Sequence, residues 1–438
     1  MVISALLGVV CSVTTPILAA RVRVAEGPTV LHASLRQQWG GHTFGYLVEG
    51  KRALFWSGIL HDATDTGLTA IVGQYPKKGR REPPATKLLT FSEPDVIRCN
   101  QPQMVRTPDG YIHIFIGLTY KTNNPNFNSG RLRYLRSRRP EDITELEDRT
   151  SLLPTKPFAD FHLRMNVGIS RDGTRMALVI LAISEDDSIP FNTPVVFFGK
   201  RKGLDFVFDE PKQYAEPTGL FYPMIAATTN GVVIVGENWT KWTAETPRSW
   251  MTLLHIGWNG QLLHREDSVM DSDGTYMAFD LRPVSTASWN KLALYMDRVP
   301  KDQSKPCRHE VWLYDVVARK LSLVRSIETT QQLSNYGKWV PISPTDSILL
   351  NNPCMGVLHA WSGDLFGSGD ITHEAIPGTD PIALGYSASA YLFVPSPLHG
   401  SVESGNGFYL ASDFYNQPQG AGKVSSCSFL LWRMVPSD

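Results

Sequence analysis

The sequence lacks an excess of charge of either sign. Lysine and arginine together number 42, aspartate and glutamate also number 42, and the formal net charge is therefore zero. Proteins that bind nucleic acid or an anionic membrane surface through their overall electrostatic field carry a net positive charge. We therefore expect no nucleic-acid partner, and an anionic ligand would have to be held by a local cluster of cations.

Long apolar runs are missing beyond the first twenty residues. Residues 1–20 carry no charged side chain, are apolar over much of Val2–Val13, and end in Ala19-Ala20 before Arg21. This pattern predicts a cleaved secretory signal peptide, with a membrane anchor as the alternative. We expect a mature chain of residues 21–438 that forms one domain, is secreted or periplasmic, and has no contact with the membrane after cleavage.

Cysteine is scarce, and the common site motifs are absent. The five cysteines form no CxxC pair, and the sequence contains no HExxH, no GxSxG and no phosphate-binding Gly-Lys-Ser/Thr loop. No cofactor is therefore expected; a structural calcium ion near the axis is compatible with the sequence, although no motif marks it. The four cysteines after residue 20 predict two disulfides, Cys307–Cys354 and Cys99–Cys427.

What the sequence does contain is a repeat. One unit recurs, made of a short apolar strand, a turn rich in Asp, Gly, Asn or Pro, and a second strand rich in β-branched and aromatic residues. Each period is long enough for four strands, which is one blade of a propeller. We therefore predict an all-β fold, a seven-bladed β-propeller. The seven units begin near His42, Asn100, His162, Tyr222, Tyr276, Tyr336 and Ser387, at intervals of 51 to 62 residues.

Details within the units can be predicted as well. The second unit has its hairpin turn at Pro108–Gly110, a third strand at Arg131–Ser137 and a fourth at Thr150–Leu153, and Pro140–Arg149 is the one segment that could form a turn or two of helix. The last unit has no sequence left for a fourth strand. We expect a strand around Pro28–Ala33 to complete it, which would close the ring and remove exposed edges.

Loops that enter the innermost strands and loops that follow the second strands open on the same face of a propeller, so this face is the expected site. Its polar and aromatic residues suit a sugar: aromatic rings for the apolar side of a pyranose, amides for hydroxyls, and cations for a carboxylate. The candidates for substrate binding are Asn100, Gln101, Lys121, Trp239, Arg282, Asn335 and Tyr336.

The second unit resembles a known family. Asn100–His113 (NQPQMVRTPDGYIH), followed by Leu132–Ile143, is similar to the second blade of secreted propellers with bacterial-neuraminidase-type repeats, a group that includes ulvan lyases and rhamnose–glucuronate lyases. Trp39–Gly45 resembles their first blade, and Ser170–Gly173 is a partial Asp-box. The clear match covers about a third of the chain.

This resemblance implies an enzyme that cleaves a uronic-acid-containing glycan by β-elimination, with a base, an acid and a cation on the carboxylate. The family has a histidine before the asparagine of the second blade and another after its second strand, whereas this chain has Cys99 and Thr119–Lys121 there. The remaining candidates for base or acid are His162 and Tyr120, with Tyr222 as a second proton carrier. Arg164, with Asn100 or Gln101, would bind the carboxylate.

Other functions stay open. Related propellers include rhamnosidases in which a first-blade histidine is important, and His42 matches that position. A sialidase would need a Tyr–Glu pair and three arginines, for which Arg164, Arg282 and Arg298 are the plausible trio. A two-carboxylate hydrolase could use Glu237 with Asp186 or Asp297. A propeller that binds a glycan or a protein without catalysis is the alternative from another class.

Overall fold

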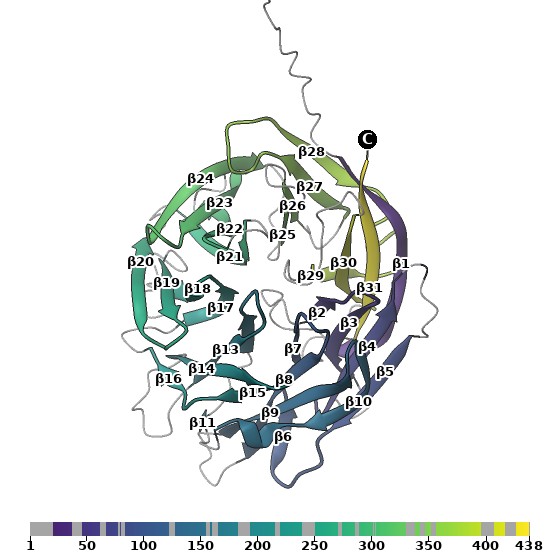
Figure 1. Ribbon diagram of the computed structural model, residues 1–438. Coiled ribbons are helices and arrows are strands. Elements are labelled where there is room, and N and C mark those ends of the chain that lie inside the picture. The colour runs from purple at the N-terminus through teal and green to yellow at the C-terminus, as the bar shows by residue number, and fades with distance from the viewer. Residues whose placement is uncertain are drawn as a thin grey trace, which may run out of the picture.

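The computed structural model describes most of the chain as β-strands. The described residues are 21–36, 46–61, 67–77, 79, 84–121, 128–154, 158–159, 165–182, 193–214, 220–238, 250–269, 274–284, 289–300, 302, 304–329, 338–341, 347–351, 356–395, 407–416 and 426–437. Their strands form seven antiparallel sheets. The sheets stand as blades around a central axis, which confirms the predicted seven-bladed β-propeller (Figure 1).

The strands follow the chain from the axis outward in each blade. Blade one holds β2 (Leu47–Glu49), β3 (Ala53–Ile59), β4 (Thr69–Pro76) and β5 (Ala85–Thr90). Blade two holds β6 (Val96–Cys99), β7 (Gln103–Arg106), β8 (Ile112–Lys121), β9 (Asn128–Arg139), β10 (Asp142–Asp148) and the short β11 (Phe158–Ala159). Blade three holds β12 (Met165–Ile169), β13 (Arg175–Ala182), β14 (Thr193–Lys202), β15 (Asp205–Phe208) and β16 (Lys212–Gln213).

The second half of the ring repeats this order. Blade four holds β17 (Leu220–Ala227), β18 (Gly231–Asn238), β19 (Trp250–Gly257) and β20 (Leu262–Val269). Blade five holds β21 (Gly274–Pro283), β22 (Lys291–Pro300), β23 (Cys307–Asp315) and β24 (Lys320–Thr329). Blade six holds β25 (Lys338–Pro341), β26 (Ser347–Asn351), β27 (Leu358–Gly363) and β28 (Ile371–Ile376). Blade seven holds β29 (Ala388–Phe393), β30 (Phe408–Tyr415) and β31 (Ser426–Ser437).

An N-terminal strand completes blade seven, as the sequence predicts. β1 (Arg21–Arg36) pairs antiparallel with β31, from Arg21 opposite Ser437 to Arg36 opposite Ser426. The two strands lie side by side at the right of Figure 1, purple against yellow. The pairing is longer than the expected Pro28–Ala33, and it closes the ring without leaving β31 as a free edge.

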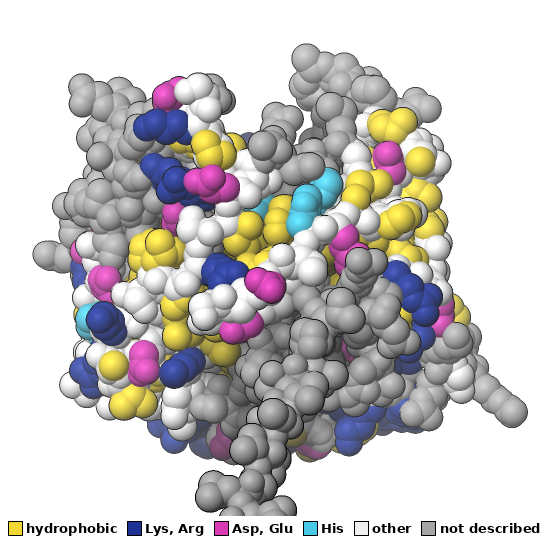
Figure 2. All heavy atoms as spheres, turned by 90° about the horizontal axis from the view of Figure 1, so that it is seen from above, with side chains coloured by type: hydrophobic (Ala, Val, Ile, Leu, Met, Phe, Trp, Pro, Cys, Tyr) yellow, Lys and Arg dark blue, Asp and Glu magenta, His cyan; other side chains and the backbone are white. Residues whose placement is uncertain are grey.

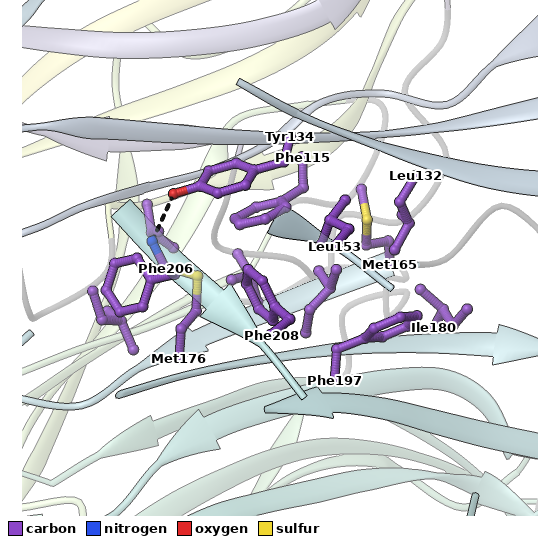
Figure 3. Close-up of a cluster of buried hydrophobic side chains, with 14 of the residues drawn as sticks. Phe115, Leu132, Tyr134, Leu153, Met165, Met176, Ile180, Phe197, Phe206 and Phe208 are labelled. Carbon is purple, nitrogen blue, oxygen red and sulfur yellow. Dashed lines mark hydrogen bonds between the residues drawn. The ribbon is translucent and has the colours of Figure 1, made fainter. Parts of the chain in front are cut away.

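Apolar side chains fill the spaces between neighbouring blades. The described residues form seven buried clusters, one at each boundary, because alternate residues of each strand point to opposite faces of a blade. Figure 3 shows the cluster between blades two and three, where Phe115 and Tyr134 of blade two meet Phe206 and Phe208 of blade three. The Tyr134 hydroxyl accepts the backbone N–H of Phe206 at 3.2 Å.

One buried carboxylate joins blades one and two. Glu141 accepts the backbone N–H groups of Lys51 at 2.7 Å and Arg52 at 2.8 Å, and its Oε1 lies 2.6 Å from an Arg106 guanidinium nitrogen. Burial alone would raise the pKa of Glu141, but these donors outweigh it, and the pKa lies below its ordinary value. The carboxylate is therefore ionised and holds the β2–β3 turn against blade two.

Two expectations for blade two are wrong. Pro140–Arg149 forms no helix, and the strand β10 occupies Asp142–Asp148 instead. In this strand Ile143 is buried, while Glu145 and Glu147 form ion pairs with arginines of β9. The predicted strand at Thr150–Leu153 is instead a short 3₁₀ helix over Thr150–Leu152. Charged residues on the outermost strand hid its alternating pattern in the sequence.

The predicted Cys99–Cys427 disulfide is also wrong. Cys99 lies in blade two and Cys427 in blade seven, and the Cys99 thiol donates to the Gly67 carbonyl at 2.9 Å. The other predicted disulfide includes Cys354, which lies outside the described residues.

No helix within the described ranges is long and apolar enough to cross a membrane. Residues 1–20 are outside those ranges, so the signal peptide stays a prediction.

Candidate functional site

The face of interest is the one on which each innermost strand begins and each second strand ends, here called the strand-start face. In blade two the chain reaches it through the segment that joins β5 to β6 and again at the end of β8. Val96 at the start of β6 lies opposite Tyr120 near the end of β8. Glu93 and Tyr120 therefore come together on this face although they are 27 residues apart in the sequence.

Four side chains form the Tyr120 cluster: Glu93, Tyr120, Arg131 and Arg133. The Tyr120 hydroxyl donates to Glu93 Oε2 at 2.5 Å, and Arg133 forms an ion pair with Glu93 Oε1. The Arg131 guanidinium lies over the Tyr120 ring, 4.8 Å from its centroid. The side chains of Glu93 and Arg133 are 38% and 28% exposed, so solvent or a ligand can reach the carboxylate.

Strand register explains the cluster. Arg131 of β9 lies opposite Leu118 of β8, and Arg133 lies opposite Ile116, so both arginines point to the same face of the blade as Tyr120. The intervening Leu132 points into the core between blades two and three. The backbone N–H of Lys121 donates to the Asp95 carbonyl at 2.7 Å, which fixes the loop that carries Glu93.

The electrostatics favour a protonated tyrosine beside an anion-binding position. Burial raises the pKa of Tyr120, and the hydrogen bond to Glu93 and the negative charge of Glu93 raise it further. The phenol therefore holds its proton at neutral pH, with a carboxylate placed to accept it. Two guanidinium groups against one carboxylate leave an excess positive charge. Arg131 makes no ion pair within the described part of the chain, so its N–H groups are available to a carboxylate.

Asn100 and Gln101 do not lie in an entering loop. They fall inside the innermost strand of blade two, between β6 and β7, and are 3% and 7% exposed. Gln101 Nε2 donates to the Ser57 carbonyl of blade one at 3.0 Å. Asn100 covers Gly117, where an added Cβ would lie 2.9 Å from Asn100 Nδ2. Both amides therefore lie inside the blade and not in a loop of the strand-start face.

Arg282, another substrate-binding candidate, does not lie on the strand-start face. It is 1% exposed and lies near the end of β21, away from the strand-start face. Its guanidinium donates to Asp280 at 2.8 Å and to the Pro395 and Val394 carbonyls of blade seven at 2.9 and 3.1 Å. A buried guanidinium needs its donors paired, and these bonds link blade five to blade seven instead of binding a ligand.

Only some of the other residues predicted for the site lie within the described part of the chain. Lys121 is exposed beside Tyr120, at the end of β8, and stays a candidate. Cys99, at the position of the family's histidine, is buried, which raises its pKa to about 12, so it exchanges no proton at neutral pH. Asp297, suggested for a two-carboxylate hydrolase, is completely buried. The side chain of Tyr222 is outside the described set, as are His42, His162, Arg164, Trp239, Asn335 and Tyr336.

The sequence prediction missed Glu93, Arg131 and Arg133. Arg131 and Arg133 alternate with Leu132 and Tyr134 in a segment predicted as a strand, which was a signal that the two arginines share a face. Nothing in the sequence pairs them with Glu93. Among the described residues, no group of three or more His, Cys, Asp or Glu is arranged to hold a metal ion.

Comparisons with known proteins give structural matches only. No family model matches the sequence, and no curated protein sequence matches it. One similar structure is a Trypanosoma rangeli sialidase in complex with the inhibitor DANA, which is 11% identical, with a TM-score of 0.40. The match covers 95% of this chain and 60% of the sialidase, so this chain spans about 60% of that protein's length. A protein of unknown function from Dyadobacter fermentans is 11% identical, with a TM-score of 0.42 and coverage of 95% and 99%.

A third similar structure is the α-L-arabinofuranosidase from Fusarium graminearum in complex with an iminosugar inhibitor. It is 10% identical, with a TM-score of 0.39, and the match covers 78% of this chain and 94% of the other. The seven antiparallel sheets of this chain form its seven-bladed β-propeller.

Proposed function

We propose that this propeller cleaves a glycan that carries a carboxylate group, and that the Tyr120 cluster is its catalytic site. The observation that supports the proposal most directly is the hydrogen bond from Tyr120 to Glu93 on a solvent-reachable face, with Arg131 against the tyrosine ring. A tyrosine whose proton is shared with a carboxylate can act as a nucleophile or can transfer a proton.

Each side chain has a role in this proposal. Arg131 and Arg133 bind the sugar carboxylate through charge-assisted hydrogen bonds. For hydrolysis, the Tyr120 oxygen attacks the anomeric carbon while the tyrosine proton passes to Glu93, and the glycosidic C–O bond breaks as the leaving oxygen takes a proton from solvent. Water then attacks the same carbon and loses a proton to solvent, the bond between Tyr120 and the sugar breaks, and Glu93 returns its proton to the tyrosine oxygen. Such a nucleophile needs an adjacent base, and Glu93 Oε2 at 2.5 Å is within that reach.

Elimination is the second candidate, favoured by the pair of arginines. A guanidinium on a uronate carboxylate acidifies the neighbouring C5–H, and a base then removes that proton as the C4–O bond breaks. Glu93 would accept the proton, directly or through Tyr120, and Tyr120 would protonate the leaving oxygen. Both reactions use the same four side chains, and their products distinguish them.

The test is product analysis on a panel of sialylated, glucuronate-bearing and rhamnose–glucuronate glycans. New reducing ends without ultraviolet absorbance indicate hydrolysis, whereas absorbance from a C4–C5 double bond indicates elimination. Tyr120→Phe should lower the rate by about 10²- to 10⁴-fold, the usual contribution of a positioned proton-transfer group.

The matched control is Tyr111→Phe. Tyr111 also has an arginine over its ring, with the Arg136 guanidinium 5.4 Å from the centroid, but it lies at the opposite end of the β7–β8 hairpin. We expect this variant to keep full activity. Full activity in Tyr120→Phe, or glycan binding with no cleavage of any panel member by the wild type, would refute the proposed catalytic role.

A further inference from the structure

Blade six carries two histidines on neighbouring strands. In β27 the side chains alternate between the two faces of the blade, so Leu358 packs toward blade seven, whereas His359 and Trp361 point toward blade five. On β28, His373 lies opposite Trp361. His359 lies opposite Ala375, two residues further along β28. The two histidines are therefore diagonal neighbours on one face of the sheet, at a spacing that aromatic side chains can bridge.

The two imidazole rings are in contact through their nitrogen atoms. His359 Nδ1 lies 3.1 Å from His373 Nε2, and the ring planes are inclined by 30°. The indole of Trp361 holds the orientation of His373, because the two rings stack with centroids 4.5 Å apart and planes inclined by 9°. His359 is only 9% exposed, so the blade restricts its rotation as well. Little rotamer freedom is therefore lost when a ligand binds to both nitrogens.

Solvent reaches this pair of histidines. His373 is exposed, and Figure 2 shows histidine side chains at the surface on the side of the molecule where β24 and β28 lie. The adjacent carboxylate, Glu374, points to the opposite face of β28, where its Oε1 accepts the backbone N–H of Val22. Within the described ranges, no third His, Cys, Asp or Glu joins the pair in an arrangement that could hold a metal ion. The pair therefore offers two nitrogen ligands with an open side toward solvent.

The separation of the two nitrogens suits a metal ion. Histidine nitrogens lie about 2.0–2.1 Å from a bound zinc ion, so two nitrogens 3.1 Å apart subtend an angle of about 100° at one shared ion. This angle lies between the ~90° of tetragonal sites and the ~109° of tetrahedral sites, and small side-chain rotations reach either geometry. Water molecules would complete the coordination on the open side.

The protons of the pair are compatible with coordination. A neutral imidazole carries one proton and one lone pair, and in the metal-free pair one facing nitrogen donates its N–H to the lone pair of the other. When a metal ion binds, that proton leaves the facing nitrogen and solvent supplies a proton to the second nitrogen of the same ring. Both facing lone pairs then bind the ion, and no net proton is released.

We propose that His359 and His373 form a surface site that binds a late first-row divalent metal ion through both imidazoles. Imidazole nitrogen suits Cu²⁺, Ni²⁺ and Zn²⁺, whereas Ca²⁺ and Mg²⁺ take oxygen ligands. Among the first three ions, the affinity of a given nitrogen site is highest for Cu²⁺, so copper is the preferred occupant. The bound ion joins the outermost strand of the blade, β28, to β27 through a side-chain bridge. The site lies on blade six, whereas the Tyr120 cluster lies on blade two.

The experiment is calorimetric titration of the full chain with CuCl₂ at about pH 7.5, where histidine is largely neutral. Glycine is present as a weak competing chelator. The expected result is one tight class of site, with one ion per chain. His359→Gln and His373→Gln should each weaken this binding by at least about tenfold, because each variant removes one of the two protein ligands.

The matched control is a second pair of histidines on neighbouring strands. His255 and His264 lie directly opposite each other on blade four. Both ring nitrogens of His255 are already engaged, Nδ1 with the Tyr314 hydroxyl at 3.1 Å and Nε2 with Asn230 Oδ1 at 3.0 Å. His264→Gln should therefore leave the tight copper binding unchanged.

Amide hydrogen exchange with excess ZnCl₂ gives a second readout, which locates the ion. Zinc should slow exchange in β28 of the wild type but not of His373→Gln, a variant that leaves no buried cavity because His373 is exposed. The proposal would be overturned by a wild type without a tight copper site, by wild-type affinity in either histidine variant, or by zinc protection that persists in His373→Gln. Neither measurement uses a glycan, so the result is independent of the proposed catalytic function.

Discussion

Removal of the Glu141 charge tests the link between blades one and two. In Glu141→Gln the side chain keeps its size, but Arg106 loses its anionic partner while only 7% of its side chain is exposed. Breaking a buried ion pair by neutralising one partner typically costs about 3–5 kcal/mol, because the other charge stays buried. We expect the free energy of unfolding to fall by about 3 kcal/mol or more.

Chemical denaturation followed by fluorescence and circular dichroism measures this change. The control is Glu145→Gln, four residues away on the same blade, where the carboxylate is 52% exposed and pairs with the exposed Arg138. An exposed ion pair contributes about 1 kcal/mol or less to stability, so the free energy of unfolding of the control should be close to that of the wild type. Equal, small losses in both variants would show that Glu141 does not stabilise the contact between the blades.

Three further predictions follow from packing and charge. Gly73→Ala should destabilise the protein by about 1–3 kcal/mol, because the new Cβ would lie 1.9 Å from a buried Trp56 ring atom, while Gly168→Ala, with its nearest neighbour at 3.5 Å, should cost less. Deletion of residues 21–36 should lower the melting temperature and promote self-association, because β31 loses its partner strand; an unchanged monomer would contradict ring closure by β1. Buried His113 should make the protein less stable as the pH falls below 6.5 toward about 3, and His113→Gln should flatten that slope in acid titrations.

The fold was largely predictable because each blade repeats the same local chemistry. Strands of two-residue periodicity, turns rich in Gly, Asn and Asp, and a recurring interval are properties of short segments, and the structure keeps them at all seven units. The predictions of secondary structure failed where a strand carries charged side chains. β10 contains four acidic residues, and its strand character depends on arginines supplied by β9.

The site was predictable only in part, because its members are joined by register and not by sequence proximity. Tyr120 was found from its place after a second strand. Glu93 was missed because it belongs to a connection between two blades, and only the pairing of Val96 with Tyr120 brings it near. Arg282 shows the opposite case: the sequence suggested an arginine that binds substrate, whereas its guanidinium is buried and donates to Asp280 and to the Val394 and Pro395 carbonyls.

The central claim is that Glu93 and Tyr120 act together in cleaving an acidic glycan. The most direct test is a double-mutant cycle on the best substrate of the glycan panel, with Glu93→Gln, Tyr120→Phe and the double variant. Groups that act as one unit are non-additive, so we expect each single variant to lose nearly all activity and the double variant to lose no more. Independent, additive losses, or single variants that cleave as fast as the wild type, would contradict the account.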